Sequence, residues 1–323
     1  MREYGYGVDV GGTSVKIGRM DRRGRLLEKW SIPTDRSDGG SRLIGDVGAS
    51  LAENMARAGL RADDLYGVGL DVPSPVDREG WVVGGENTGW GRKRLDAAGE
   101  LSALLRVPVR ALNDGNAAAL GEMWKGAGAG CRDLVMLTVG TALGGGVIAD
   151  GRVVTGSHGA GGEVGSMMMD PTETEIAVDG RGGCLEQYAS ATGLVRKAKK
   201  LLASDARPSV LRGLAEPTAK DVMEAARAGD DLACRTLDFF SEMLGRACSI
   251  MASVTDPELF VIGGGVSAAG EILLEGVRKY YRKYAYFALS QTRFELARLG
   301  NDAGIYGSCY FVLPEDAKKD LLG

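Results

Sequence analysis

The residues Asp9-Val10-Gly11-Gly12-Thr13 end the first predicted strand, Tyr4–Asp9, with two successive glycines. Such a pair permits a tight turn whose backbone N–H groups can face phosphate oxygens, and the Thr13 hydroxyl adds a donor. Asp9 could hold a magnesium ion through water. An ordinary hairpin turn also explains paired glycines, so this stretch alone leaves both interpretations open. The spacing of a P-loop, GxxxxGK[ST], is absent from it.

Two further strands run into glycine turns. They are Thr138-Val139-Gly140-Thr141-Ala142-Leu143-Gly144-Gly145-Gly146 and Leu259-Phe260-Val261-Ile262-Gly263-Gly264-Gly265-Val266-Ser267. In the actin–hexokinase type of fold, two such turns clamp the phosphates of a nucleotide and a third meets the adenosine. Three junctions in this order are hard to explain by chance. We therefore predict an ATP site that uses Asp9, Gly11, Gly12, Thr13, Lys16, Gly140, Thr141, Gly264 and Gly265, with Mg²⁺ bound through ATP and Asp9.

The chain also repeats its order of elements. Strands are predicted at Tyr4–Asp9, Ser14–Asp21 and Leu26–Ile32 in the first half, and at Leu134–Val139, Gly145–Ala149 and Arg152–Thr155 in the second. Each triplet is followed by helices and a further strand, which gives two βββαβα-like halves. We expect an α/β fold of the actin/hexokinase-like (ribonuclease H-like), duplicated type, with two lobes and an interlobe cleft. Residues 1–116 form the predicted small lobe, joined by a C-terminal helix at about 305–323, and residues 117–304 form the large lobe.

Composition bounds the class of protein. The 323 residues contain 44% apolar and 25% charged residues, and the formal net charge is −4. These values are ordinary for a soluble globular protein and indicate neither nucleic-acid binding nor attraction to an anionic membrane. Five widely spaced cysteines with no CxxC pair argue against a disulfide framework. No signal peptide or transmembrane segment is evident, so we expect a cytoplasmic protein.

Further motifs occur in order along the chain. They are Gly69-Leu70-Asp71-Val72-Pro73-Ser74-Pro75-Val76-Asp77, Asn87-Thr88-Gly89-Trp90, Asn113-Asp114 with the alanine-rich helix that follows, Gly159-Ala160-Gly161-Gly162-Glu163-Val164-Gly165, Gly183-Cys184-Leu185-Glu186 and Leu299-Gly300-Asn301-Asp302-Ala303-Gly304. Together with the three glycine turns, they make the chain resemble the ROK family of bacterial-type sugar kinases, which includes many glucokinases. The resemblance runs from about Tyr6 to Ser308.

The resemblance implies roles for particular residues. Asp114 matches the family's catalytic base, and a carboxylate there can accept the proton of a sugar hydroxyl that attacks the γ-phosphate. Asn113, Glu163 and Glu186 match positions that bind sugar hydroxyls. The expected reaction is phosphorylation of a hexose, at the 6-hydroxyl if the substrate is glucose. Relatives of this type often pair, so a homodimer is expected.

The sequence departs from the family pattern at its zinc site. Ser166 stands where the family has a histidine that binds both zinc and sugar, and Cys184 is the one cysteine left of a CxCGxxGC run. One thiolate cannot make a four-ligand site, so no zinc is expected. Ser166 is shorter than histidine, which puts a plain glucose pocket in question. Ala142 stands where the second phosphate turn usually has glycine, which is tolerable if its φ is negative.

Three alternatives stay open to different degrees. A sugar-responsive repressor would carry a helix-turn-helix domain ahead of Asp9, and we expect none here. A non-catalytic sugar-binding or actin-like protein would not need Asp114. Kinases for fructose, N-acetylhexosamines, allose or a cyclitol share the chemistry, and sequence separates them poorly because specificity depends on a few hydroxyl contacts.

Overall fold

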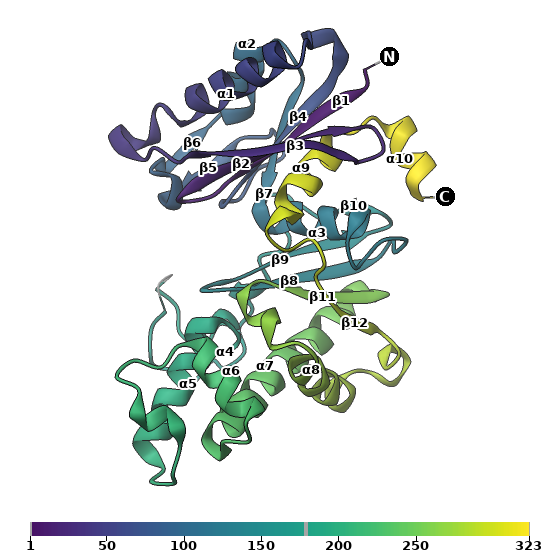
Figure 1. Cartoon of the computed structure of the whole chain (residues 1–323). Coiled ribbons are helices and arrows are strands. Elements are labelled where there is room, and N and C mark those ends of the chain that lie inside the picture. Colours follow the sequence, from purple (N-terminus) through teal and green to yellow (C-terminus); the bar gives the residue numbers. More distant parts are fainter. Residues whose placement is uncertain (1, 178–179, 323) are drawn as a thin grey trace. The chain divides into compact units, whose positions relative to one another are not determined.

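Each half of the chain opens with three strands, and the two five-stranded sheets have the same strand order (Figure 1). The first sheet, β3-β2-β1-β4-β7, contains β1 (Tyr4–Val10), β2 (Ser14–Asp21), β3 (Leu26–Pro33), β4 (Leu65–Val72) and β7 (Val109–Asn113). The second, β10-β9-β8-β11-β12, contains β8 (Leu134–Val139), β9 (Leu143–Ala149), β10 (Arg152–Val153), β11 (Leu259–Gly263) and β12 (Arg293–Leu296). The equal order confirms the internal duplication predicted from the sequence.

Strand direction is repeated as well. In the first sheet β1–β2 and β2–β3 are antiparallel, whereas β4 and β7 join in parallel. In the second sheet β9–β10 is antiparallel, and β11 lies parallel to both β8 and β12. Parallel strands require both faces of a sheet to be covered, and β4 is buried at every position. The carboxyl ends of β1, β4 and β7 therefore meet at one edge of the first sheet, where the candidate residues lie.

The computed structural model describes residues 2–177 and 180–322, and these form two compact units. Unit 1 consists of Met1–Arg132, Gly146–Gly162 and Leu299–Gly323, and unit 2 of Asp133–Gly145 and Glu163–Arg298. These units are defined by the contacts within each of them, whereas the lobes of a kinase are defined by their movement relative to each other. The lobe boundary near residue 117 therefore stays a prediction.

Helix α9 (Ala303–Val312) brings the end of the chain back into unit 1, where it packs on β1, β4 and α3 (Asp114–Lys125). Glycines make this approach possible. A Cβ at Gly69 would lie 1.8 Å from the carbonyl oxygen of Ser308, and one at Gly307 would lie 1.7 Å from that of Ala117. Real Cβ atoms never come so close, so α9 can touch both the sheet and α3 only because these positions lack side chains.

The rest of unit 1 covers the outer face of the sheet. Helices α1 (Leu43–Arg57) and α2 (Ala97–Leu105) pack against each other, and α1 buries Leu43, Val47 and Leu51 at helical spacing. A two-stranded hairpin, β5 (Val82–Gly85) and β6 (Gly91–Leu95), and the short α10 (Glu315–Leu322) complete the unit.

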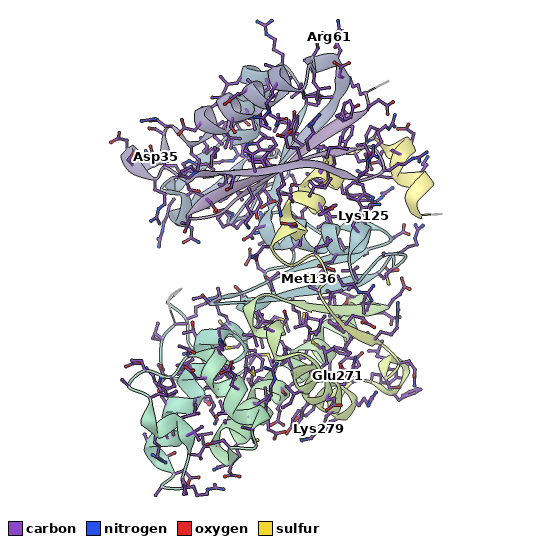
Figure 2. All side chains as sticks on the ribbon, in the orientation of Figure 1. Asp35, Arg61, Lys125, Met136, Glu271 and Lys279 are labelled. Carbon is purple, nitrogen blue, oxygen red and sulfur yellow. The ribbon has the colours of Figure 1, made fainter. Side chains whose placement is uncertain are left out.

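Unit 2 adds a helical layer to its strands. It contains α4 (Glu186–Ala189), α5 (Ala191–Ser204), α6 (Ala219–Arg227), α7 (Asp231–Thr255) and α8 (Glu271–Tyr284). On α8, the labelled Glu271 and Lys279 lie on the exposed face, while Leu273 and Val277 are buried (Figure 2). This alternation is typical of an amphipathic helix packed on a core, here against α7.

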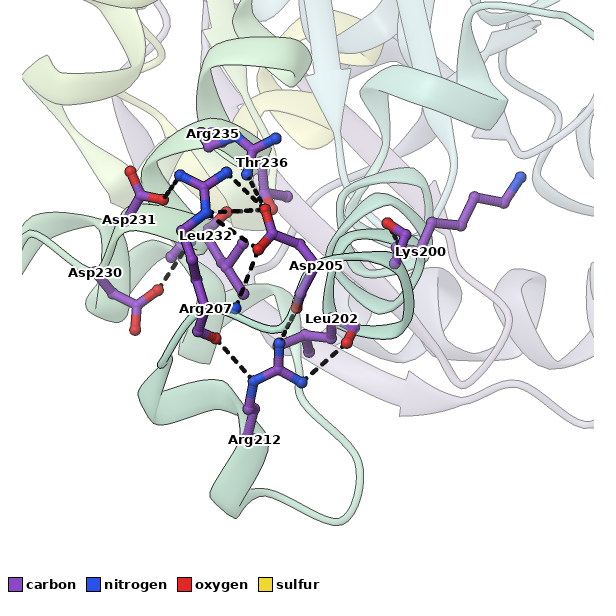
Figure 3. A network of polar contacts seen from close by, with 12 residues as sticks. Lys200, Leu202, Asp205, Arg207, Arg212, Asp230, Asp231, Leu232, Arg235 and Thr236 are labelled. Atoms are coloured by element: carbon purple, nitrogen blue, oxygen red, sulfur yellow. Dashed lines mark hydrogen bonds and ion pairs between the residues drawn. The ribbon is translucent and has the colours of Figure 1, made fainter.

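A polar network holds the loop between α5 and α6 (Figure 3). The carboxylate of Asp205 accepts hydrogen bonds from Arg207 and from Arg235, the latter at 2.5 Å, and Arg207 also pairs with Asp231 at 2.6 Å. The two guanidinium groups lower the pKa of Asp205 well below its usual value. Arg212 donates to backbone carbonyls of the same loop. These contacts order a segment that has little apolar surface to bury.

The structure differs from the sequence-based expectation at three places. The alanine-rich helix was expected after Asn113-Asp114, whereas α3 already begins at Asp114, because Asn113 caps it. Strand β10 is only two residues long. The β5–β6 hairpin was not predicted, since its second strand, Gly-Arg-Lys-Arg-Leu, is largely exposed and lacks an apolar alternation. Within residues 2–177 and 180–322, no helix combines the length and the apolar character needed to cross a bilayer.

Candidate active site

The first glycine turn joins β1 to β2 in unit 1. It is closed by a hydrogen bond from the Gly11 amide to the Ser14 carbonyl, 3.1 Å long, and by one from the Thr34 hydroxyl to the Gly11 carbonyl, 2.7 Å long. The amide of Gly11 is therefore used within the turn. The amides of Gly12 and Thr13 have no backbone partner among the described residues. They are the donors of this turn that can meet phosphate oxygens.

Two cross-strand neighbours surround Asp9, at the end of β1. On one side Lys16 faces it across the antiparallel β1–β2 pair, and the Lys16 ammonium lies 2.9 Å from the Asp9 carboxylate. On the other side Asp71 faces it across the parallel β1–β4 pair. Two carboxylates and one ammonium thus meet at the same edge of the sheet.

Asp71 is the candidate residue that the sequence prediction missed. It is fully buried, and neither of its carboxylate oxygens accepts a hydrogen bond from a described residue. Burial and then the negative charges of Asp9 and Asp114 raise the pKa of Asp71 well above its ordinary value. A protonated Asp71 can donate to Asp9, which makes two facing carboxyl groups compatible. The signal in the sequence was an aspartate near the end of an apolar strand, as Asp9 is near the end of β1.

Asp114 is the first residue of α3 and follows β7 directly. Its Oδ1 accepts hydrogen bonds from its neighbour's amide, Gly115 N, at 2.8 Å, and from Asn113 Nδ2 at 3.0 Å. Asn113 also caps the helix, because its Oδ1 accepts from Asn116 N at 3.1 Å. These bonds fix the position of the carboxylate at the start of the helix, and Asp114 is exposed to solvent. The arrangement orients Oδ1 of Asp114 at a solvent-exposed position.

The sugar-side residues of unit 2 lie around a short 3₁₀ turn, Val164–Ser166. Glu186 begins α4, and its Oε2 accepts a hydrogen bond of 3.0 Å from the Leu143 amide. Burial and then the negative charge of Glu186 raise the pKa of Glu163. The two glutamates are therefore electrostatic neighbours, as expected for two acceptors that serve one ligand.

The residues around Ser166 do not have the chemistry of a zinc site. The Ser166 hydroxyl accepts a hydrogen bond of 3.1 Å from the guanidinium of Arg181. Cys184 is buried beside this loop, where it forms a β-bridge with Met168. A fixed cation opposes a divalent metal, and serine is a poor zinc ligand, so these residues do not fit zinc. Val178 and Asp179, which stand within the altered cysteine run, lie outside the described residues.

The two glycine turns of unit 2 lie side by side, because β8 and β11 are parallel neighbours and Gly263 pairs with Thr138. Gly264 has φ +80°, and a Cβ there would lie 2.5 Å from the Val139 carbonyl oxygen, so glycine is required. In the other turn, the Gly140 amide donates to Ala142 O at 2.9 Å. Ala142 has no positive φ, so its methyl group is tolerated.

The structure thus gathers the predicted residues into two sets. Unit 1 brings together Asp9, Lys16, Asn113 and Asp114, and adds Asp71. Unit 2 brings Glu163 close to Glu186 and places the turns at Gly140 and Gly264 next to each other. Carboxylate oxygens are the ligands that Mg²⁺ prefers, and Asp9, which stands next to the first glycine turn, could supply one to an ion bound with ATP.

Comparison with known proteins decides the family. The sequence model of the ROK family matches residues 5–315. The chain belongs to the ROK family. The glucokinase of Halalkalibacterium halodurans is 36% identical over 321 residues, which covers 96% of this chain and 95% of the relative. This confirms the family predicted from the sequence.

Solved ROK structures show the same fold. The ROK hexokinase from Thermus thermophilus superposes with a TM-score of 0.81 at 31% identity, covering 98% of this chain and 99% of the other. A ROK family glucokinase from Streptomyces griseus, in complex with glucose and AMPPNP, gives a TM-score of 0.75 at 32% identity, covering 95% and 98%. The predicted actin/hexokinase-like fold and the sugar-kinase class are therefore confirmed for this ROK protein.

Proposed function

We propose that this ROK protein is an ATP-dependent glucokinase that phosphorylates the 6-hydroxyl of glucose, with Asp114 as general base. The observation that carries the proposal is the position of Asp114, an exposed carboxylate at the start of α3 that is held by Asn113 and by the Gly115 amide. The similarity to glucokinases over nearly the whole chain supports glucose as the substrate. The individual residue roles are our own assignment.

The chemistry follows from these groups. The sugar oxygen attacks the γ-phosphorus of ATP, a new O–P bond forms, and the bond from the γ-phosphorus to the bridging oxygen breaks, so that ADP leaves with that electron pair. Asp114 accepts the proton of the attacking hydroxyl as the oxygen becomes nucleophilic. Asn113, Glu163 and Glu186 fix the orientation of the sugar through its other hydroxyls.

The phosphates are assigned to two glycine turns and Lys16, and the adenosine to the third turn. The amides of Gly12 and Thr13 and the hydroxyl of Thr141 donate to phosphate oxygens, and the turn at Gly264–Gly265 meets the adenosine. Asp9 and ATP together would hold Mg²⁺, which when bound neutralises charge on the phosphates. We propose no zinc, a homodimer and a cytoplasmic location, as the sequence predicts.

A coupled assay of ADP release over a panel of sugars tests the proposal. The panel contains glucose, fructose, N-acetylglucosamine, N-acetylmannosamine, allose and myo-inositol. Glucose should give the highest kcat/KM. Folded protein that releases no additional ADP with any sugar would exclude a kinase, and a higher kcat/KM with another sugar would correct the substrate because Ser166 and Arg181 reshape that end of the pocket.

The role of Asp114 is tested in the same assay. Asp114→Asn should lower kcat by about 10²–10⁴-fold, the usual contribution of a general base, while the Kd of glucose stays the same. Asp63→Asn, an exposed aspartate of the same unit, is the control and should leave kcat unchanged. Metal analysis of the same preparation tests the absence of zinc, and one zinc per chain would contradict it.

A further inference from the structure

A cavity of about 700 Å³ lies within unit 1, away from the residues assigned to ATP and sugar. Its walls come from α3, α9, α10, the start of β7 and the turn between β9 and β10. This volume falls in the range of pockets that bind small metabolites. Nothing in the proposed reaction uses it.

The cavity is strongly basic. Five cationic side chains line it, Arg110, Arg132, Arg152, Lys318 and Lys319, against two carboxylates, Asp150 and Glu315. The local excess of three positive charges stands out in a chain whose formal net charge is −4. Such a concentration of cations attracts a multiply charged anion.

Contacts with neighbouring residues hold two of the cations, Arg110 and Lys318, in the cavity wall. The Arg110 guanidinium lies 3.8 Å from the ring centre of Phe311 and donates to the Phe311 carbonyl at 3.2 Å. Lys318 donates to the same carbonyl at 3.3 Å and pairs with Glu315 at 3.0 Å. Arg152 is exposed and has no hydrogen bond or ion pair to another described residue. Arg152 acts electrostatically on Asp150 and Glu315, which also attract Arg132 and Lys318, so two carboxylates share the charge of several cations and a net positive charge is left for a phosphate group.

The remaining wall is apolar and contains one polar group without a partner. Leu120, Val153 and the rings of Tyr310 and Phe311 supply it. Tyr310 is 3% exposed, and its hydroxyl makes no hydrogen bond with any described residue. The hydroxyl itself is buried behind the wall, so Tyr310 offers the cavity its ring rather than a hydrogen bond.

From these features we infer that this cavity binds a small organic phosphate, with its phosphate at Arg110, Arg152 and Lys318 and its carbon body against Tyr310 and Phe311. A sugar phosphate matches the volume, the charge and the mixed wall. Inorganic phosphate shares the charge but fills little of the space.

The site is connected to the candidate catalytic residues by two helices. Helix α9 carries Tyr310 at its far end and Gly304 at its start, where an added Cβ would lie 3.1 Å from the carboxyl groups of Asp9 and Asp71. Helix α3 carries Leu120 in the cavity wall and begins at Asp114. Because Gly307 packs directly on Ala117, neither helix can shift alone.

A second cavity of about 400 Å³ strengthens the connection. It shares Arg110, Thr155 and Phe311 with the first and is also lined by Asn113. A ligand that moves the Arg110–Phe311 pair would therefore act on the residue that holds Asp114. The bound phosphate regulates turnover, and this regulatory part rests on the proposed function, whereas the binding itself does not.

Hydrogen exchange of the full chain locates binding. The probes are ribose 5-phosphate, glucose 6-phosphate and inorganic phosphate. Ribose 5-phosphate should slow amide exchange in residues 150–153 and 310–319, and inorganic phosphate should do so weakly. Protection confined to residues 9–16 and 111–116, or none, would overturn the site and leave the proposed kinase untouched.

The double variant Arg152→Ala, Lys319→Ala tests the cations, and both side chains are exposed, so the fold should persist. The Kd of ribose 5-phosphate should rise about tenfold or more, the effect of losing one charge-assisted hydrogen bond. The control, Arg23→Ala, removes an exposed arginine of the same unit and should not change Kd. An unchanged Kd in the double variant would refute the site. A change of kcat by ribose 5-phosphate that the double variant abolishes would support regulation, and an unaltered kcat would refute it.

Discussion

The ammonium group of Lys16 lies 2.9 Å from the carboxylate of Asp9, directly across the β1–β2 pair. The same ammonium reaches the backbone carbonyl of Asn301 at 3.4 Å. Its positive charge also opposes the rise in the pKa of Asp71. One lysine therefore pairs with Asp9 and also acts electrostatically on Asp71, at the end of the strands where the phosphates of ATP are assigned.

Lys16→Met should raise the KM for ATP about tenfold or more, because it removes a charge-assisted contact. Steady-state kinetics with varied ATP measure this. Lys29→Met is a matched control, since Lys29 forms a similar pair with Asp302, also 2.9 Å long, but lies outside the candidate site. If both variants have the same KM for ATP, Lys16 does not bind the nucleotide.

Asp71→Asn should change how stability depends on pH. The raised pKa means that folded Asp71 keeps its proton at pH values where the unfolded chain has released it. The free energy of unfolding therefore falls as pH rises above about 4, the ordinary pKa of an aspartate, up to the folded value. Asparagine cannot ionise, so the variant should be more stable than the wild type at neutral pH and lose this advantage in acid.

Urea unfolding across the acid-to-neutral range measures the difference, with Asp63→Asn as the control because Asp63 is exposed. Parallel stability curves for the wild type and Asp71→Asn would show that Asp71 titrates normally.

Glu186→Gln should move the acid limb of the kcat/KM profile for glucose to lower pH. Glu163 must be ionised to accept hydrogen bonds from sugar hydroxyls, so activity falls as pH drops through its pKa. The charge of Glu186 contributes to the raised pKa of Glu163, and glutamine removes that charge while still accepting from Leu143 N. The exposed Glu224→Gln is the control. If the acid limb of the kcat/KM profile does not move, the ionisation of Glu163 does not control sugar binding.

Gly307→Ala should destabilise the protein by about 3 kcal/mol or more, the upper range for an overpacked contact. The added Cβ would meet the Ala117 carbonyl oxygen at 1.7 Å and force α9 away from α3. Gly45→Ala is the matched control, since it lies in α1 with no atom within 4 Å of an added Cβ. It should stabilise by about 0.5–1 kcal/mol through helix propensity. Denaturant unfolding of both variants provides the comparison, and equal stability would contradict the close packing.

The sequence predicted the parts of the fold that depend on local pattern. Glycine turns after apolar strands and the duplicated order of elements were readable, because each arises from short-range periodicity. The position of Asp114 after a short apolar strand could be predicted for the same reason. The raised pKa of Asp71 could not be predicted from the sequence, because it depends on the pairing of β1 with β4, which lie about 60 residues apart.

Contacts between distant loops could not be predicted from the sequence either. The hydrogen bond from Arg181 to Ser166 depends on the path of an irregular loop, for which no periodic pattern exists. The basic cavity needs residues of β7, the β9–β10 turn and α10 to meet, and each cation alone resembles an ordinary surface residue. Only the folded arrangement shows that they share one space.

The return of α9 to the first sheet also affects the order in which the protein can fold during synthesis. Strands β1 and β4 leave the ribosome early, yet the helix that covers them, Ala303–Val312, is among the last segments to be made. All of unit 2, which ends at Arg298, is available before α9 exists. The N-terminal sheet must therefore wait with one apolar face uncovered, which makes the nascent chain a candidate for chaperone binding until translation is nearly finished.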